Sequence, residues 1–349
     1  MTGSSESLVV RPLADQDAPL WDAFVEAAPD GTFFHLAGWR RVLAESFGHK
    51  TYFVLAESGG DIRGVLPLVH VKSRLFSNGL ISNAFCVYGG PLAADAEALA
   101  ALDRYALTLM QETGADFIEY RNRTPSHPDW ACKDDLYVTF RKEIDPSPEV
   151  NLKAIPRKQR AVVRKALDQK RLREEIDGTT DRFFHLYAMS VRNHGTPVFP
   201  ARFFRLLKEE FGDACEIVTV LDGDEPISCV MSFYFRDEVL PYYAGGTPAA
   251  RSVGAHDYMY WRLIEKGGEQ GIRVFDFGRS KVGTGSFSFK KNWGFTPEPL
   301  HYEFMMRDGK PIPEVNPLNP KYHLMIEAWK RLPLPVANAI GPLLARNLG

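Results

Sequence analysis

The pattern of apolar and polar positions contains one helix-and-hairpin unit that occurs twice. Residues 37–68 and 201–232 align without a gap at an offset of 164. In each copy apolar residues recur at helical spacing up to a Phe-Gly pair, Phe47-Gly48 and Phe211-Gly212. Two apolar runs follow, joined by a short turn rich in Gly and Asp, which is typical of a β-hairpin. The pattern predicts a helix in each copy, followed by strands at 52–56 and 64–71 and at 216–221 and 227–235.

The similarity between the two halves continues downstream. Tyr88-Gly89-Gly90-Pro91 parallels the segment 243–248, and each is followed by a long helical pattern, at 96–112 and at 254–270. Each helix leads into an acidic and aromatic strand, at 116–120 and at 274–277. A repeated order of helix, hairpin, helix and strand predicts an α/β fold with one mixed sheet in each half.

The length of 349 residues suits two domains with separate hydrophobic cores. We expect an N-terminal domain at 1–148, a C-terminal domain at 149–310, and a C-terminal extension at 311–349 that packs on the body. The Pro-rich acidic segment at 145–149 is the expected linker between the two domains.

Composition narrows the class of protein. The net charge is −2, which gives the molecule as a whole no attraction to nucleic acid or to a membrane. The N-terminus lacks the pattern of a signal peptide, and no run of about 18 apolar residues predicts a membrane span. We therefore expect a cytoplasmic protein, and the apolar segment 332–349 is a candidate for peripheral contact with the inner face of the membrane. No CxxC pair occurs, so we expect no metal site, and reduced, buried thiols at Cys86, Cys132, Cys215 and Cys229.

Four short segments resemble those of FemAB-type aminoacyltransferases. They are Phe33–Trp39 (FFHLAGW), Tyr88–Pro91 (YGGP), the basic stretch Pro156–Ala166, and Phe289–Gly294 (FKKNWG). The pattern is most similar to the FemAB-like proteins that accompany exopolysaccharide and PEP-CTERM export systems, and it covers most of residues 8–306. The resemblance implies two tandem GCN5-related N-acetyltransferase (GNAT) domains. The chain departs from FemAB enzymes because only residues 160–175 are available for their long helical arm, which favours the broader acetyltransferase-like branch.

The same resemblance implies an activity. It is the transfer of an acyl group from acyl-CoA or aminoacyl-tRNA to an amine acceptor, without a metal, in cell-envelope or exopolysaccharide biosynthesis. The acceptor is expected to be a small molecule or to be lipid- or nucleotide-linked. The donor stays open, because Gln159–Lys165 lacks the glycines of the Q/R-x-x-G-x-G/A loop with which GNAT proteins bind pyrophosphate.

Acyl transfer to an amine requires stabilisation of an oxyanion and removal of a proton. Lys290 matches the lysine of the family's Phe-Lys segment, and with Lys291 and Asp276 it forms the expected catalytic group. Glu119 and Arg121 are the counterparts of the Asp276 region in the first half. Nine Lys or Arg residues occur in 153–173, and four of them, Arg171 included, recur at helical spacing that suits phosphate groups. The expected substrate-binding residues are Arg157, Arg160, Arg164, Arg192, His194, Tyr243, Arg279, Ser280, Trp293, His35 and Trp39.

Two other functions compete with acyl transfer. A tandem GNAT protein that has lost its donor site would act as a non-catalytic scaffold of an export or polysaccharide system, and its cleft would be filled by side chains. A nucleic-acid-binding protein built on the basic helix is less favoured, because the aromatic residues that stack on bases are missing there. We expect no DNA partner, while tRNA remains a candidate partner as a donor.

Overall fold

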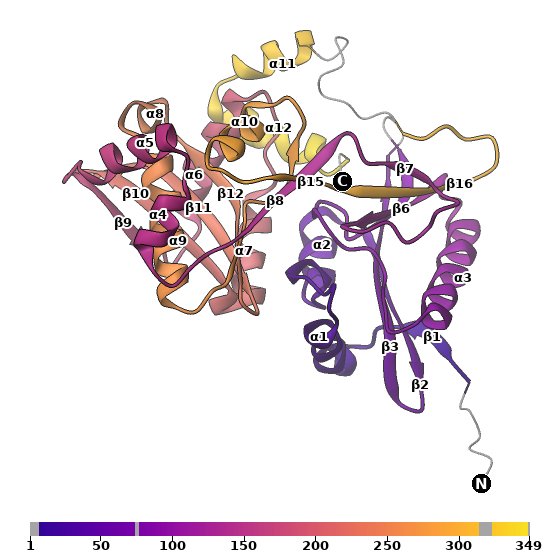
Figure 1. Ribbon diagram of the computed structural model, residues 1–349. Helices are drawn as coiled ribbons and strands as arrows, with labels where there is room; N and C mark the ends of the chain where they lie inside the picture. Colours follow the sequence, from indigo (N-terminus) through magenta and orange to yellow (C-terminus); the bar gives the residue numbers. More distant parts are fainter. Residues whose placement is uncertain (1–6, 74–76, 314–322, 348–349) are drawn as a thin grey trace. The chain divides into compact units, whose positions relative to one another are not determined.

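The computed structural model describes residues 7–73, 77–313 and 323–347, and the chain forms two compact units. Unit 1 comprises Met1–Asp134, Leu300–Val315 and Arg346–Gly349, and unit 2 comprises Asp135–Pro299 and Asn316–Ala345. Each unit is a mixed β-sheet with helices on both faces (Figure 1). The predicted α/β class with two mixed sheets is confirmed.

In unit 1, helices α1 and α2 lie on one face of the sheet and α3 covers the other (Figure 1). The helices are α1 (Ala18–Ala27), α2 (Trp39–Phe47) and α3 (Ala96–Thr113), with 3-10 turns η1 (Asp15–Asp17) and η2 (Phe33–His35). The strand order is β1 (Val9–Pro12), β2 (Lys50–Ser58), β3 (Asp61–Lys72), β4 (Asn78–Ser82), β6 (Phe117–Asn122), β16 (His301–Met306) and β7 (Ala131–Lys133), with β5 (Leu92–Ala93) paired to β3.

Unit 2 repeats this plan. Its sheet runs β9 (Leu172–Ile176), β10 (Cys215–Asp222), β11 (Glu225–Phe235), β12 (Glu238–Gly246), β13 (Val274–Asp276), β8 (Tyr137–Glu143) and β14 (Ser280–Lys281), with β15 (Pro297–Pro299) paired to β8. Helices α6 (Asp181–Asn193) and α7 (Ala201–Phe211) pack on the sheet, as does α9 (Ala255–Glu269). The remaining helices are α4 (Pro148–Ala154), α5 (Arg157–Leu167), α8 (Pro248–Val253), α10 (Gly285–Asn292), α11 (His323–Lys330), α12 (Leu334–Ala345) and the 3-10 turn η3 (Gly212–Ala214).

The duplicated helix and hairpin form as the apolar pattern predicts. The helices α2 and α7 end at Gly48 and Gly212, whose φ angles of 69° and 49° lie in the left-handed region that glycine adopts without steric cost. The hairpins β2–β3 and β10–β11 are antiparallel, and each contains one register shift close to its turn. Alternate strand residues face opposite sides, so Val54 and Ala56 enter the core under α3 while Val218 and Val220 enter the core under α9.

The two copies exchange one strand. Strand β16 follows the second copy in the sequence but pairs with β6 and β7 of unit 1. Strand β8 follows the first copy but pairs with β13 and β15 of unit 2. The expected linear boundary at 148/149 therefore differs from the observed division. Each sheet takes its strand next to β6 or β13 from the other half of the chain, and a division by sequence order alone cannot represent that.

Helices α11 and α12 belong to unit 2, where both contact α6. Small residues allow close packing there: Gly341 lies against the backbone of Val198, and a Cβ at Gly341 would approach the Val198 nitrogen to 3.0 Å. Part of the predicted extension, 314–322, lies outside the described residues. No helix in the described part of the chain combines the length and the apolar character needed to cross a bilayer.

Candidate active site at the end of strands β12 and β13

Strands β12 and β13 diverge after a short stretch of pairing. They are parallel, and their pairing joins Glu238 to Val274 and Val239 to Phe275. Beyond this point β12 continues along β11, while β13 continues along β8. The register of β12 against β11 shifts near Tyr242, which indicates a β-bulge that turns this part of the strand. Diverging parallel strands leave room for a ligand and for backbone N–H groups that the sheet does not use.

Lys290 of α10 reaches the end of β13. Its Nζ donates hydrogen bonds to the carbonyl oxygens of Gly278 at 2.9 Å and Arg279 at 3.1 Å. The ammonium also lies over the rings of Phe140 and Phe277, at 5.6 and 6.0 Å from the ring centres. Burial lowers the pKa of Lys290 to about 7, although nearby Asp276 acts in the opposite direction. Burial thus brings the pKa of Lys290 close to neutral pH.

Asp276 is held by three groups around the same strand end. Its Oδ1 accepts hydrogen bonds from Gly278 N–H at 2.7 Å and from the Thr139 hydroxyl at 3.1 Å. Its Oδ2 accepts from the Arg141 guanidinium at 2.9 Å, and Arg141 also forms a bidentate pair with Glu238. The side chain of Asp276 is fully buried. Asp276 is thus an anchor for the turn that presents the two carbonyls to Lys290, and Arg141 and Thr139 come from the exchanged strand β8.

Three further side chains surround this turn. Arg279 lies over the ring of Tyr137 at 4.6 Å. Ser280 is buried, and its hydroxyl has no hydrogen-bond partner among the described residues. Gly278 has a φ of 67°, and a Cβ there would lie 3.7 Å from the ring of Tyr242. The ring of Tyr242 therefore lies close to Gly278, at the end of β13. Lys291, by contrast, is exposed and lies beside the ring of Phe287.

The short helix α8 and Gly254 connect β12 to α9, and no role was predicted for this connection from the sequence. Residues 251–256 read Arg-Ser-Val-Gly-Ala-His, which matches the first half of the Q/R-x-x-G-x-G/A pattern. Gly254, with a φ of 71°, ends α8 and begins α9. His256 stands where the pattern has Gly or Ala. Its Nδ1 lies 2.8 Å from the Ser228 hydroxyl, and burial lowers the pKa of His256 to about 4, so it is neutral at pH 7. The Arg-x-x-Gly sequence between a predicted strand and a predicted long helix was the signal that could have identified this segment.

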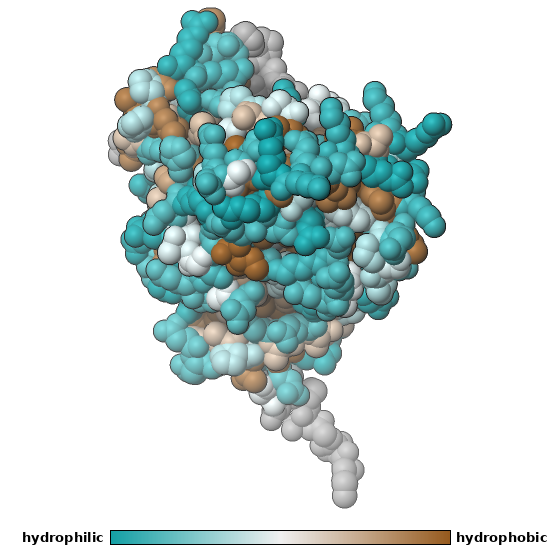
Figure 2. All heavy atoms as spheres, turned by 90° about the vertical axis from the view of Figure 1, so that its left-hand side faces the viewer, coloured by the Kyte–Doolittle hydropathy of each residue, from teal (hydrophilic) through white to brown (hydrophobic). Residues whose placement is uncertain are grey.

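The basic helix α5 packs beside the junction of α8 and α9. A Cβ at Gly254 would lie 3.2 Å from Ala166 Cβ, and Gln169 donates a hydrogen bond to the Val253 carbonyl at 2.6 Å. Helix α5 ends at Leu167, so Arg171 lies outside it and pairs with Asp222 instead of extending the predicted stripe. Hydrophilic residues cover most of the side of the molecule that is turned to the viewer in Figure 2. None of the basic side chains of α5 pairs with a carboxylate in the part of the chain that the structure describes: Arg157, Lys158, Arg160, Arg164 and Lys165.

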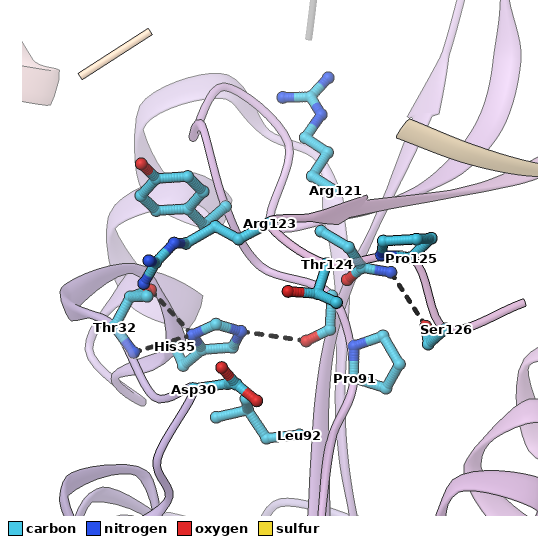
Figure 3. Close-up of a pocket in the computed structure, with 13 residues that line it drawn as sticks. Asp30, Thr32, His35, Pro91, Leu92, Arg121, Arg123, Thr124, Pro125 and Ser126 are labelled. Carbon is cyan, nitrogen blue, oxygen red and sulfur yellow. Dashed lines mark hydrogen bonds between the residues drawn. The ribbon is translucent and has the colours of Figure 1, made fainter. Parts of the chain in front are cut away.

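Unit 1 contains a separate cavity of about 270 Å³. Its lining mixes charged, polar and apolar side chains. Asp30 and Arg123 are exposed and oppositely charged, and Arg123 lies 5.9 Å from the centre of the Tyr88 ring. In Figure 3 the Arg123 side chain extends toward Thr32, whereas that of Arg121 points away. Hydroxyl and amide groups complete the wall at Thr124, Ser126 and Asn122. The cavity offers charge, hydrogen bonds and one aromatic face, which suits a small polar ligand.

Comparison with known proteins agrees with this geometry. A model of the acetyltransferase (GNAT) domain matches residues 153–291. The fold is that of tandem GNAT proteins.

Three solved structures have a fold similar to that of this chain. A FemX crystal structure has a TM-score of 0.66 at 16% identity and covers 91% of this chain and 100% of its own. A tandem GNAT protein of the clavulanic acid pathway has a TM-score of 0.52 at 13% identity, with 88% and 100% coverage. The C-terminal domain of a protein assigned as a lysylphosphatidylglycerol synthetase, from Agrobacterium fabrum, has a TM-score of 0.53 at 13% identity, with 83% and 91% coverage. At these identities the likeness concerns the fold. No curated protein matched the chain significantly.

Several residues expected to bind substrate have internal partners in unit 2. Trp293 is fully buried, and its indole N–H donates to Asp257 at 3.2 Å. Tyr243 is buried in an aromatic cluster. Arg192 donates to the carbonyls of Lys330 and Leu332 and so holds the end of α11. His194 is exposed. The structure therefore brings Lys290, Asp276, Arg279 and Ser280 together, and does not join Trp293 or Arg192 to them.

The two expected binding residues of unit 1 also have structural roles. His35 Nδ1 accepts hydrogen bonds from the Thr32 N–H at 3.2 Å and hydroxyl at 2.8 Å, so the proton is on Nε2, which donates to the Gly90 carbonyl at 3.0 Å. The Trp39 indole donates to the Phe33 carbonyl at 3.0 Å. His35 lines the cavity with these groups already used, whereas Trp39 is fully buried.

Two further expectations meet a clear outcome. Glu119 and Arg121 pair with each other at 2.7 Å in the interior of unit 1, as a structural ion pair. Cys86, Cys215 and Cys229 are buried as expected, but Cys132 is exposed, because β7 is an edge strand of its sheet. No group of three or more His, Cys, Asp or Glu side chains with metal-binding geometry occurs among the residues described.

Proposed function

We propose that this protein is an N-acyltransferase that moves an acyl group from acyl-CoA or aminoacyl-tRNA to an amine acceptor. The observation that carries the proposal is the enclosed Lys290 ammonium at the end of β13, inside the matched GNAT domain and beside the point where β12 and β13 diverge. A lysine with a pKa of about 7 in that position is suited to proton transfer at physiological pH.

The contacts of Lys290 define two roles for one side chain. In its neutral form the amine has two hydrogens, which the carbonyls of Gly278 and Arg279 engage, so its lone pair is left to accept a proton. In its protonated form the third hydrogen is available to an oxyanion. In the proposed reaction the acceptor nitrogen attacks the carbonyl carbon of the donor and loses a proton to Lys290. The tetrahedral intermediate then collapses, the carbon–sulfur or carbon–oxygen bond breaks, and the leaving group receives the proton.

The donor's phosphates are proposed to bind at the start of α9. The first N–H groups of a helix point outward and favour anions. Arg251 is exposed next to this helix end, and the unpaired cations of α5 lie on the helix that packs against it. Coenzyme A and tRNA both present phosphates, so this surface does not separate the two donors. The imidazole of His256 is neutral at pH 7 and adds no charge.

We infer that the acceptor is a small or lipid-linked amine of cell-envelope or exopolysaccharide biosynthesis. An association with a PEP-CTERM export system and a cytoplasmic location belong to the same proposal and rest on the sequence resemblance.

Release of free coenzyme A from acetyl-CoA tests the proposal, with amino sugars and their nucleotide-linked forms as acceptors. Because the exposed thiol of Cys132 would itself react with a thiol reagent, the assay uses Cys132→Ser as the background. Lys290→Met should abolish turnover while leaving donor binding intact, and Lys291→Met, at the exposed neighbour, is the matched control. In parallel, aminoacyl-tRNA with a labelled amino acid replaces acetyl-CoA. Full turnover by Lys290→Met would refute the assigned chemistry.

One observation favours the scaffold alternative. The Tyr242 ring lies close to Gly278, at the strand end where the proposed donor carbonyl would bind. Calorimetric titration separates the two functions. Binding of coenzyme A or aminoacyl-tRNA to the wild type supports the enzyme. If the wild type binds neither donor, and Tyr242→Ala binds neither donor as well, the scaffold function is supported.

A further inference from the structure

The last two helices expose an unusual amount of apolar side chain. On α12, Val336, Ile340 and Leu343 are 40%, 40% and 65% exposed. Their spacing of four and three residues places them on one side of the helix. At the start of α11, Leu324 and Met325 are 82% and 64% exposed. We call these five side chains the C-terminal apolar face. Exposed apolar side chains gathered on one side of a helix, as on α12, mark interaction surfaces.

The opposite side of α12 is firmly packed. Ala337, Gly341 and Ala345 are buried, and Gly341 lies against Val198. Arg192 holds the end of α11 through the carbonyls of Lys330 and Leu332. The body of unit 2 therefore already uses the small-residue side of α12. The C-terminal apolar face is turned outward in a fixed position and is not needed for docking the helices.

Charge distinguishes among the partners that this face would fit. Helix α12 contains no charged residue. The only acidic side chain of α11 is Glu327, which is paired with Lys330 at 2.7 Å. Arg331, between the two helices, is exposed and has no carboxylate partner among the described residues. The described part of these two helices thus combines an apolar stripe with exposed cations at Arg331 and Arg346 and without an unpaired carboxylate. This combination complements a surface whose interior is apolar and whose outer layer is negative. An anionic phospholipid bilayer is such a surface.

We propose that the C-terminal apolar face binds the surface of an anionic phospholipid bilayer. The side chains of Val336, Ile340 and Leu343 enter the boundary between headgroups and acyl chains, and Arg331 contacts headgroup phosphates. Helix α12 has 12 residues, about 18 Å at 1.5 Å per residue, so it lies in the plane of the membrane and does not cross it. The proposal does not depend on acyl transfer, because it concerns surfaces that carry none of the proposed catalytic groups.

Co-sedimentation of the full chain with vesicles tests this proposal. Vesicles of phosphatidylcholine alone are compared with vesicles that also contain about 30% phosphatidylglycerol. Wild type should bind the anionic vesicles more strongly. The double variant Leu324→Glu/Ile340→Glu should reduce that binding by at least about tenfold, since two apolar contacts are replaced by charges that the lipid repels. Arg331→Glu should remove the preference for anionic lipid. Leu20→Glu, at a position 59% exposed on α1, is the matched control and should leave binding unchanged.

Light scattering on the same samples measures the oligomeric state and so tests whether a second copy of the chain, and not lipid, covers the face. Absence of vesicle binding by a folded wild type, or equal binding by the double variant, overturns the proposal. It is also overturned if the wild type forms a dimer that the double variant does not form and neither binds lipid. The face would then be a contact between two copies of the chain. Circular dichroism of each variant confirms that the fold is retained.

Discussion

The substitution Glu303→Gln tests whether buried charge holds the exchanged strand β16 in unit 1. Glu303 is fully buried and accepts hydrogen bonds from the backbone N–H groups of Ser126 at 3.0 Å and His127 at 2.7 Å. Its other oxygen contacts Asn122 Nδ2 at 2.5 Å and lies 3.3 Å from His127 Nδ1. His127 also contacts Asp103 of α3 at 3.0 Å. The charge on Glu303 therefore links β16 to the loop after β6 and, through His127, to α3.

The size of the effect follows from the two pKa values. Hydrogen bonds from His127 and Asn122 outweigh burial and lower the pKa of Glu303 to about 2, while Asp103 and Glu303 raise the pKa of His127 to about 9. A shift of this size in the pKa of Glu303 corresponds to at most about 3 kcal/mol. Because Asp103 and His127 are partly exposed, we expect Glu303→Gln to lower the free energy of unfolding by about 2 kcal/mol. The two shifts describe one interaction and are not added.

The dependence on pH makes this prediction specific. The contribution of Glu303 is present above its unfolded pKa and is lost as pH falls through about 2, because its folded pKa is lowered. The contribution of His127 is present below about 6.5 and is lost as pH rises through about 9, because its folded pKa is raised. The difference between wild type and Glu303→Gln should thus be largest between about pH 4.5 and 6.5 and should shrink on both sides.

Urea unfolding followed by fluorescence at several pH values measures this difference. Trp130 stacks on His127 at 4.2 Å, so its emission reports on the unit that contains β16. Glu298→Gln, at an exposed carboxylate, is the matched control and should have little effect. A loss of stability that is the same at every pH, or smaller than about 0.5 kcal/mol, would refute the role of the ionised carboxylate.

Three other predictions concern unit 2. The wild-type kcat/KM should rise with pH through about 7 as Lys290 loses its proton, and Lys290→Arg should show no such rise; a profile unchanged in Lys290→Arg contradicts Lys290 as the base. Arg251→Ala should weaken coenzyme A binding by about tenfold, as measured by calorimetry. Arg236→Ala, at another exposed arginine of unit 2, is the control. Equal affinities of Arg251→Ala and the wild type would exclude the α9 site. Arg141→Met should lower the free energy of unfolding by about 3 kcal/mol, because the buried Asp276 loses its guanidinium partner, whereas a stable variant would show that Asp276 does not depend on it.

Much of the fold was predictable because local patterns encode it. The ends of α2 and α7 at a Phe-Gly pair, and the hairpins that follow, depend on residues close in sequence. The strand exchange was not predictable in the same way. Strands β8 and β16 have similar apolar patterns, and the periodicity of a strand identifies its buried face but not the strand with which it pairs. Helix α5 was placed correctly, whereas Arg171 follows the helix end and precedes β9.

The residues of the candidate site were predictable only where they belong to a short sequence motif. Lys290 was found through the Phe-Lys segment, but its partners were not, because Arg141 lies on a strand from the other half of the chain. The Arg251–His256 segment was missed because His256 replaces the expected small residue. Trp293 and His35 were assigned to substrate because aromatic and imidazole groups serve both cores and binding sites. Only their hydrogen bonds, to Asp257 and to Gly90, distinguish these roles.

The placement of β8 and β16 indicates how such a chain can arise. If the two copies were separate molecules, each would donate its last strand to the other, which is the arrangement of a domain-swapped homodimer. Joining the two polypeptides end to end would preserve every pairing and would fix the partners at equal stoichiometry. Separate expression of either half should therefore yield an incomplete sheet, while co-expression of the two fragments should restore a folded complex without a covalent connection.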